Sequence, residues 1–132
     1  MLLTKASEYA MLSLMMLSRQ DYPEDVDTLS KRLNISRSFL AKVLQGLARE
    51  GILKSYKGAK GGFSLNQKPE DISIKRVIEI AEKKPITVFE CAQDTSLCPS
   101  SKGEFCLIWP FLNKFQSKID EFLEEMTLKD IL

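Results

Sequence analysis

The chain has three cysteines, and all of them fall in one short stretch, at Cys91, Cys98 and Cys106. Six residues separate the first pair and seven separate the second, and the prolines, serines and glycine near them predict a loop. Thiolate sulfur is a soft ligand that selects zinc, Cu(I) or iron–sulfur clusters. The spacing lacks the C-x-x-C pattern of zinc fingers and is wider than the compact ferredoxin motifs. The stretch predicts a metal or cluster site, with redox-sensing thiols or inert cysteines as alternatives.

The chain contains no histidine. This excludes Cys–His and Ser–His catalysis, and it removes the usual partner of cysteine at zinc sites. A fourth ligand would be an acidic oxygen or a small molecule, or the position would stay open. Since no pair of a nucleophile and a base is visible, we expect a protein that is not an enzyme. An odd number of cysteines, without a convincing signal peptide or membrane span, predicts a cytoplasmic protein with reduced thiols.

The charges of the 132 residues are unevenly distributed, although the net charge is only +1. Residues 107–132 contain three basic and five acidic residues. Residues 36–63 contain one acid, Glu50, and six basic residues: Arg37, Lys42, Arg49, Lys54, Lys57 and Lys60. A basic middle beside an acidic end predicts that the middle region binds an anionic partner.

Helix-capping residues and apolar periodicity divide the first half of the chain. Thr4 is expected to cap a first helix, Asp27 a short second helix, and Ser36 a third helix that ends at Gly51. A short helix, a tight turn and a second helix with a buried leucine row are typical of a helix-turn-helix. An alternating, glycine-centred hairpin over residues 52–65 follows directly, which is the wing of a winged helix-turn-helix.

The third helix and the wing carry the candidate DNA contacts. The amino-terminal end of a recognition helix reaches base edges in the major groove, and its free N–H groups suit a phosphate. Lysines between glycines at the wing tip suit a phosphate or the minor groove. The alternative is that these are solvated surface charges. The predicted contacts are Ser36, Arg37, Ser38, Lys42, Gln45, Lys57 and Lys60.

A long helix after Cys106 carries an apolar stripe at spacings of four, four, three and four residues. No obvious partner helix exists for it in the same chain, so we expect the stripe to be buried between two subunits. Its members are Phe111, Phe115, Ile119, Phe122 and Met126. The predicted fold is mainly α with a small hairpin wing. Residues 1–68 would form the DNA-binding domain, and residues 69–132 the cysteine loop and dimerisation helix, in one compact unit with it.

Several motifs resemble one known family. They are M-L-L-T-K-A-S-E-Y-A at the start, N-I-S-R-S-F-L-A-K-V-L in the third helix, K-G-A-K-G-G-F in the wing, and the three late cysteines. Together they resemble the winged helix-turn-helix regulators typified by IscR and the nitric-oxide sensor NsrR, along essentially the whole chain. The resemblance implies a homodimeric regulator of transcription that binds double-stranded DNA, and we expect this regulator to be a repressor. It also implies a [2Fe–2S] or [4Fe–4S] cluster in each subunit, whose state controls DNA binding.

The resemblance assigns roles to single residues. Cys91, Cys98 and Cys106 fall on the cluster ligands, and Ser38 falls on a DNA contact of the recognition helix. Lys57 falls where an arginine commonly enters the minor groove, although lysine lacks the planar fork of arginine.

The chain also departs from IscR-like members. Trp109 replaces their histidine ligand, and Ala41 replaces an acidic residue that IscR uses to select its operators. Glu8 occupies the position from which NsrR-like members supply an acidic ligand across the dimer. The alternative for Glu8 is a first-turn acid favoured by the helix dipole. The alternative for the whole protein is a winged-helix regulator whose cysteines sense oxidants or metal directly, without a cluster.

Overall fold

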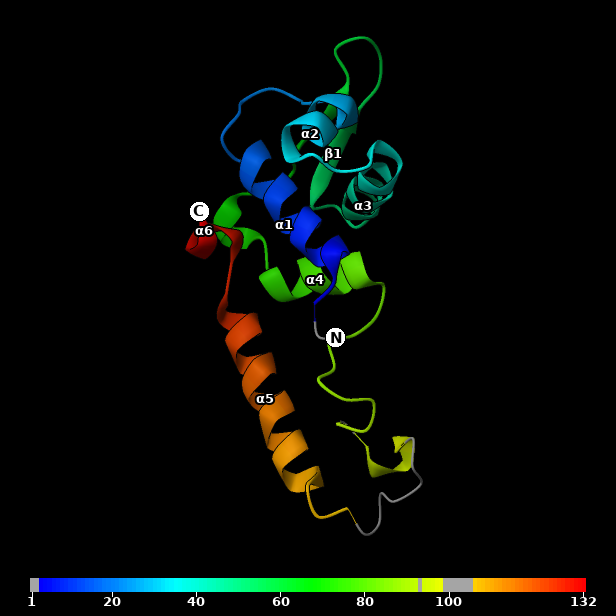
Figure 1. The fold of residues 1–132 in the computed structure, drawn as a ribbon. Coiled ribbons are helices and arrows are strands. Elements are labelled where there is room, and N and C mark those ends of the chain that lie inside the picture. Colours follow the sequence, from blue (N-terminus) through cyan, green and yellow to red (C-terminus); the bar gives the residue numbers. More distant parts are fainter. Residues whose placement is uncertain (1–2, 93, 99–105) are drawn as a thin grey trace.

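The computed structural model describes residues 3–92, 94–98 and 106–132. A compact head contains most of the elements, and one long helix extends away from it beside the cysteine segment (Figure 1). The elements in chain order are α1 (Lys5–Leu17), α2 (Val26–Leu33), α3 (Arg37–Arg49), β1 (Leu53–Tyr56), β2 (Gly62–Leu65), η1 (Pro69–Asp71), α4 (Ile74–Glu82), η2 (Thr95–Leu97), α5 (Trp109–Glu125) and α6 (Leu128–Ile131). The centre of the predicted cysteine loop, residues 99–105, lies outside the described residues.

A capping side chain lies at the start of each of the helices α1, α2, α3 and α4. Thr4 accepts a hydrogen bond from the Ala6 N–H and Ser36 caps α3, as predicted. Ser73 caps α4. The predicted cap of α2 was wrong. Asp25 caps it, accepting from the Thr28 N–H at 2.6 Å, and Asp27 lies inside the helix. This bond lowers the pKa of Asp25, because it stabilises the carboxylate form.

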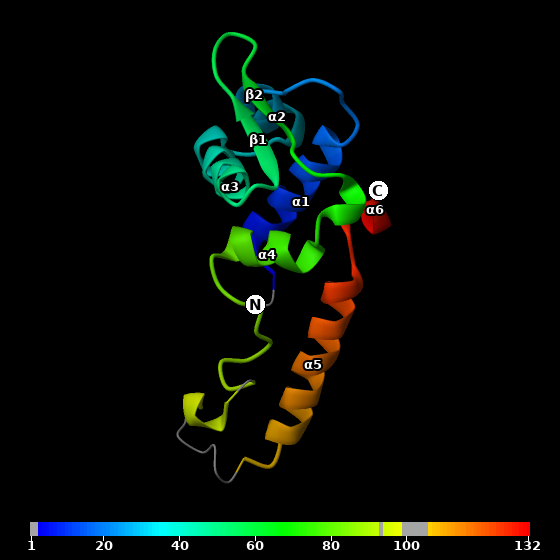
Figure 2. The same cartoon turned by 180° about the vertical axis from the view of Figure 1, so that it is seen from behind.

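The turn between α2 and α3 depends on Asn34, which ends α2 in the left-handed conformation with φ of 56°. Asparagine adopts this conformation more readily than most residues. The short turn brings α3 across α2, which makes the predicted helix-turn-helix. α1 packs against α3 and α4 and completes the helical part of the head (Figures 1 and 2).

The wing is an antiparallel pair in which Leu53 lies opposite Leu65 and Tyr56 opposite Gly62. The loop before α2 adds a bridge to it, because the backbones of Glu24 and Phe63 exchange two hydrogen bonds of 3.0 and 2.9 Å. Gly62 has φ of 144°, and a Cβ there would collide with the Glu24 carbonyl. The close approach of the loop therefore requires glycine.

The main core lies between α1, α2, α3, α4, the wing and α6. Its fully buried members include Leu14, Leu29, Leu40, Leu44 and Leu47, and α6 contributes Leu128. A smaller core joins α4 to α5 and to the chain after α4. Its buried members are Ile74, Ile78, Ile86 and Leu123.

The carboxyl-terminal end of α5 is tied to the start of α4. Ile74 N–H donates to the Met126 carbonyl at 3.0 Å, and Leu128 N–H donates to the Ile72 carbonyl at 2.9 Å. Lys75 pairs with Glu124 at 2.9 Å, and this hydrogen bond raises the pKa of Lys75. The predicted fold class is confirmed: mainly helical, with a hairpin wing and a long helix near the carboxyl terminus. Within the described residues, no helix has the length and apolarity needed to span a membrane.

Candidate functional site

The amino-terminal end of α3 presents the predicted recognition residues to solvent. Arg37, Lys42 and Gln45 are exposed, and the hydroxyls of Ser36 and Ser38 lie 3.1 Å apart at the first turn. Arg37 lies 3.7 Å from Asp27, a loose ion pair between two exposed side chains. Exchanging such an exposed ion pair for a contact between Arg37 and a phosphate would cost little free energy. The helix therefore offers polar and cationic side chains at the end from which a major groove is read.

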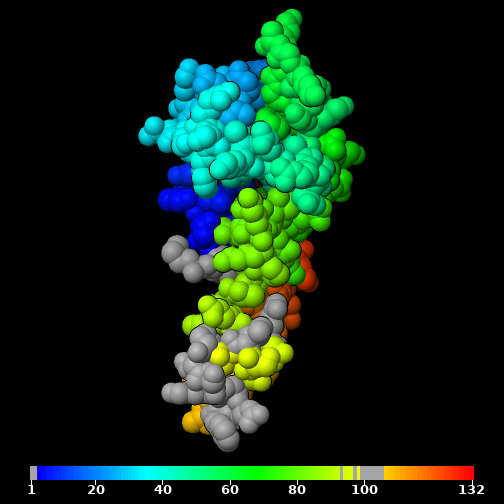
Figure 3. Space-filling view, turned by 90° about the vertical axis from the view of Figure 1, so that its right-hand side faces the viewer, coloured from blue at the N-terminus to red at the C-terminus, as the bar shows by residue number. Residues whose placement is uncertain are grey.

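The wing tip projects beyond the rest of the head (Figure 3). Lys57 and Lys60 are exposed there, and Gly58 between them has φ of 97°. Lys54 lies over the ring of Tyr56, with its ammonium 5.5 Å from the ring centroid. The structure brings the cationic side chains of the wing and α3 to the same end of the molecule.

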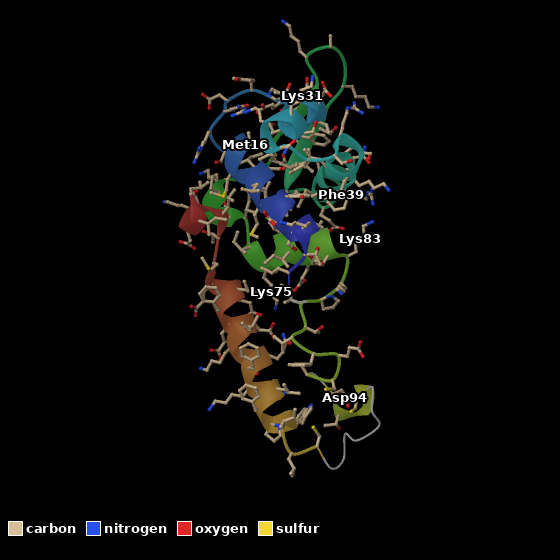
Figure 4. All side chains as sticks on the ribbon, viewed as in Figure 1. Met16, Lys31, Phe39, Lys75, Lys83 and Asp94 are labelled. Carbon is tan, nitrogen blue, oxygen red and sulfur yellow. The ribbon has the colours of Figure 1, made fainter. Side chains whose placement is uncertain are left out.

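The start of α1 contacts the start of the recognition helix. The rings of Tyr9 and Phe39 meet edge to face, with centroids 5.7 Å apart, and Figure 4 shows Phe39 on α3 beside α1. Glu8, the neighbour of Tyr9, is half exposed and pairs with Lys5 at 2.8 Å. The predicted ligand Glu8 therefore lies on a helix that touches α3, the predicted recognition helix.

The cysteine segment lies at the end of the molecule opposite the wing, beside the amino-terminal end of α5 (Figures 1 and 2; Asp94 is labelled in Figure 4). Cys91 is buried, and Cys98 and Cys106 are partly exposed. In the part of the chain that the structure describes, no three Cys, Asp or Glu side chains form a group that could hold a metal ion. The donor set itself, three thiols, suits a soft metal or a cluster.

Trp109, which stands where IscR-like members have a histidine ligand, forms a hydrogen bond with the protein backbone. Its indole N–H donates to the Cys91 carbonyl at 2.8 Å, which fixes the first cysteine to the start of α5.

The predicted dimerisation stripe divides into two sets. Phe111, Phe115 and Phe122 are exposed, whereas Ile119 and Met126 are partly buried against the small core of their own chain.

Comparison with known proteins identifies the family of this chain. The family model of Rrf2, described as an iron-dependent transcriptional regulator, matches residues 3–132. The chain belongs to the Rrf2 family. It is 31% identical over 140 residues to a putative HTH-type transcriptional regulator of Aquifex aeolicus, with 100% of this chain and 92% of the relative covered.

Two further proteins extend the comparison. The chain is 30% identical to the HTH-type transcriptional regulator NsrR of Halalkalibacterium halodurans, which covers 100% of this chain and 90% of the relative. A solved structure of a putative transcriptional regulator from Listeria innocua aligns with a TM-score of 0.77 at 24% identity, covering 98% of this chain and 84% of that one. The chain is therefore a transcriptional regulator, and its relatives are regulators and not enzymes.

The structure gives Glu82 of this Rrf2 protein a set of contacts that the sequence did not predict. It ends α4, immediately before the chain turns towards the cysteines, and it accepts hydrogen bonds from Thr4 Oγ1 at 2.6 Å and Ser7 Oγ at 2.5 Å. Partial burial raises its pKa, but the hydrogen bonds from Ser7 and Thr4 outweigh that effect and lower it overall. Glu82 joins the stem of the cysteine segment to the start of α1. Its only signal in the sequence is an acid at the end of a helix, where the dipole disfavours it.

Proposed function

We propose that the protein is a homodimeric repressor whose affinity for DNA depends on an iron–sulfur cluster held by Cys91, Cys98 and Cys106. The observation that carries this proposal is the arrangement of two regions. The described parts of the cysteine segment lie at one end, a basic helix and wing lie at the other, and α1, α4 and α5 lie between them (Figure 1). The description of the family as iron-dependent supports the choice of metal. The protein would act in the cytoplasm, where thiols stay reduced.

The DNA contacts we propose are the exposed residues of α3 and the wing: Ser36, Arg37, Ser38, Lys42, Gln45, Lys57 and Lys60. In a dimer, two copies of α3 would lie in successive major grooves, roughly 34–36 Å apart. The wing lysines would contact phosphates and contribute mainly affinity, whereas Ser38 at the start of α3 would contribute to sequence preference.

DNA binding can be tested with a duplex selected by the wild-type protein from a random-sequence pool. Fluorescence anisotropy at several salt concentrations measures affinity and its salt dependence. We expect Lys57→Ala with Lys60→Ala to reduce the salt slope by about 2, since each phosphate contact contributes about one released counterion. Lys118→Ala, on α5, is the matched control and should leave the slope unchanged. An equal slope in the wing variant and the control would contradict the proposed wing contacts.

The second copy would cover the outer face of α5. Phe111 and Phe115 stack there with centroids 6.0 Å apart, and Phe122 continues the exposed face. A contiguous patch of exposed apolar side chains is a feature of protein interaction sites. Ile119 and Met126 would line the edge of this interface, since their own chain already covers part of each.

The cluster would be held by the three thiolates, with Glu8 of the partner subunit as the oxygen ligand. Such a cluster supplies chemistry that responds to oxidants or nitric oxide, at a potential set by its ligands and surroundings. Glu8 lies beside Tyr9, which contacts the recognition helix. A ligand on α1 would therefore link cluster state to the position of α3.

The cluster is tested by anaerobic reconstitution with iron and sulfide, followed by absorption and Mössbauer spectroscopy. We expect a coloured protein whose spectrum changes in Glu8→Ala but not in Glu70→Ala, an exposed acid on η1. An iron-free, colourless wild-type protein would contradict the cluster. A spectrum unchanged by Glu8→Ala would exclude Glu8 as a ligand and leave the three cysteines in place.

The partial exposure of Cys98 and Cys106 favours a second candidate function, direct sensing of oxidants by the thiols. In that case, serine substitutions at the cysteines would leave anaerobic DNA affinity unchanged and abolish its response to peroxide. Under the cluster hypothesis, the same substitutions would change anaerobic affinity as well.

A further inference from the structure

Three side chains on the inner face of α5 donate hydrogen bonds to the backbone of the segment that contains the first cysteine, residues 86–92. Trp109, Asn113 and Gln116 are spaced by four and three residues, so they share one helix face. The Trp109 indole N–H donates to the Cys91 carbonyl at 2.8 Å, and the Asn113 amide donates to the Ala92 carbonyl at 3.1 Å. We call these three residues the carbonyl clamp.

Gln116 completes the clamp at the other end of the segment. Its amide nitrogen donates to the Ile86 carbonyl at 2.9 Å and to Asp120 at 3.1 Å, while its oxygen accepts from the Val88 N–H at 2.8 Å. Only 3% of Gln116 is exposed. A buried amide is costly unless its donors and acceptor are satisfied, and this one uses both donors and the acceptor. A fully satisfied buried amide specifies one geometry for the backbone it binds.

The clamp determines where Cys91 lies. Two successive carbonyls, those of Cys91 and Ala92, are held by donors from α5, and Ala92 is fully buried. Because the backbone on the carboxyl side of Cys91 cannot rotate freely, its Cα–Cβ bond keeps one direction relative to α5. An indole N–H is a donor only and cannot bind a metal. Trp109 therefore contributes to the cysteine site by holding a ligand in place.

We propose that Trp109, Asn113 and Gln116 are positioning residues that keep Cys91 buried and aligned with α5. This inference rests on the proposed function of the cysteines as the sensing site. It makes Cys91 the fixed thiol of the set. It also connects any displacement of Cys91 to the helix whose outer face carries Phe111 and Phe115.

The test is the rate at which iodoacetamide alkylates each cysteine in reduced, iron-free, full-length protein, measured by peptide mass spectrometry. In the wild type we expect Cys91 to react more slowly than Cys106. Trp109→Phe keeps the aromatic bulk and removes the donor, so we expect it to raise the Cys91 rate about fivefold, the factor that one lost hydrogen bond yields. The rates of Cys98 and Cys106 should change less than twofold. Ser117→Ala, an exposed position on α5, is the matched control.

Asn113→Ala provides a second variant that also removes one carbonyl donor, and it should raise the Cys91 rate in the same direction. An unchanged Cys91 rate in both variants would overturn the clamp, and so would an equal rise at all three cysteines. The labelling result decides the clamp whether or not iron is incorporated, so its failure is distinct from failure of the cluster. After reconstitution, Trp109→Phe should also release iron to a chelator faster than Ser117→Ala.

Discussion

The head and α5 differ in how completely one chain buries its apolar side chains. In the head, Leu14, Leu40 and Leu44 have no exposed surface, and α6 returns to close the core with Leu128. On α5, Phe111 is 65% exposed and Phe122 is 60% exposed. Burial of a large apolar side chain contributes about 1.5–3 kcal/mol. The head therefore gains this free energy within one chain, whereas the outer face of α5 gains it only when a second surface covers it.

The difference in burial between the head and α5 is tested most strongly by a substitution that makes a cavity in the head. Leu44→Ala removes a fully buried side chain, so we expect it to lower the free energy of unfolding by about 2–5 kcal/mol, including the cost of the cavity. Urea denaturation followed by circular dichroism measures the loss. Leu107→Ala is the control, since Leu107 is 95% exposed and should lose little. Similar losses in both variants would contradict the described core.

A charge on the outer face of α5 tests the opposite region. Phe122→Asp should weaken self-association about a hundredfold, the effect of one central interface residue, because a carboxylate would be buried against the partner. Light scattering across a concentration series measures the change. The circular dichroism spectrum should stay that of the wild type, because Phe122 contributes little to the core of its own chain. Glu121→Asp, an exposed neighbour, should associate normally. A wild type that is monomeric at every concentration would contradict the proposed dimer.

A smaller effect is expected at Glu82, which links the two regions. Glu82→Gln removes the charge that strengthens the hydrogen bonds from Thr4 and Ser7, so we expect a loss of about 1 kcal/mol at neutral pH. In the folded protein the pKa of Glu82 lies below its usual 4.5. The stabilisation by the Glu82 carboxylate is therefore complete at pH values above 4.5, and it is lost as the pH falls through the pKa of the folded state.

Urea denaturation of the Glu82 variant at a series of pH values measures this dependence. The difference from the wild type should be largest near neutral pH and disappear in acid. Glu79→Gln on the same helix controls for the change of charge. A difference that grows as the pH falls would have the wrong sign and would exclude the proposed role of the carboxylate.

Local rules in the sequence were enough to predict the winged helix-turn-helix. Thr4 and Ser36 cap their helices as predicted, because a cap depends on residues within one turn of it. The error at α2 has the same origin, since two candidate acids, Asp25 and Asp27, lie two residues apart. Capping preference alone does not distinguish them. The pairing of Glu24 with Phe63 determines where the chain enters the helix.

The sequence by itself also determined which residues could do chemistry: three thiols, no histidine, and basic side chains on α3 and the wing. Only the tertiary structure decided what surrounds them. Glu82 meets Thr4 across 78 residues, and Gln116 meets Ile86 across 30. From the sequence, a glutamine in a helix is expected to be solvated. The tertiary structure shows that the Gln116 amide binds the backbone of a neighbouring segment. Contacts of this kind depend on packing between distant segments, and periodicity and caps carry no information about that packing.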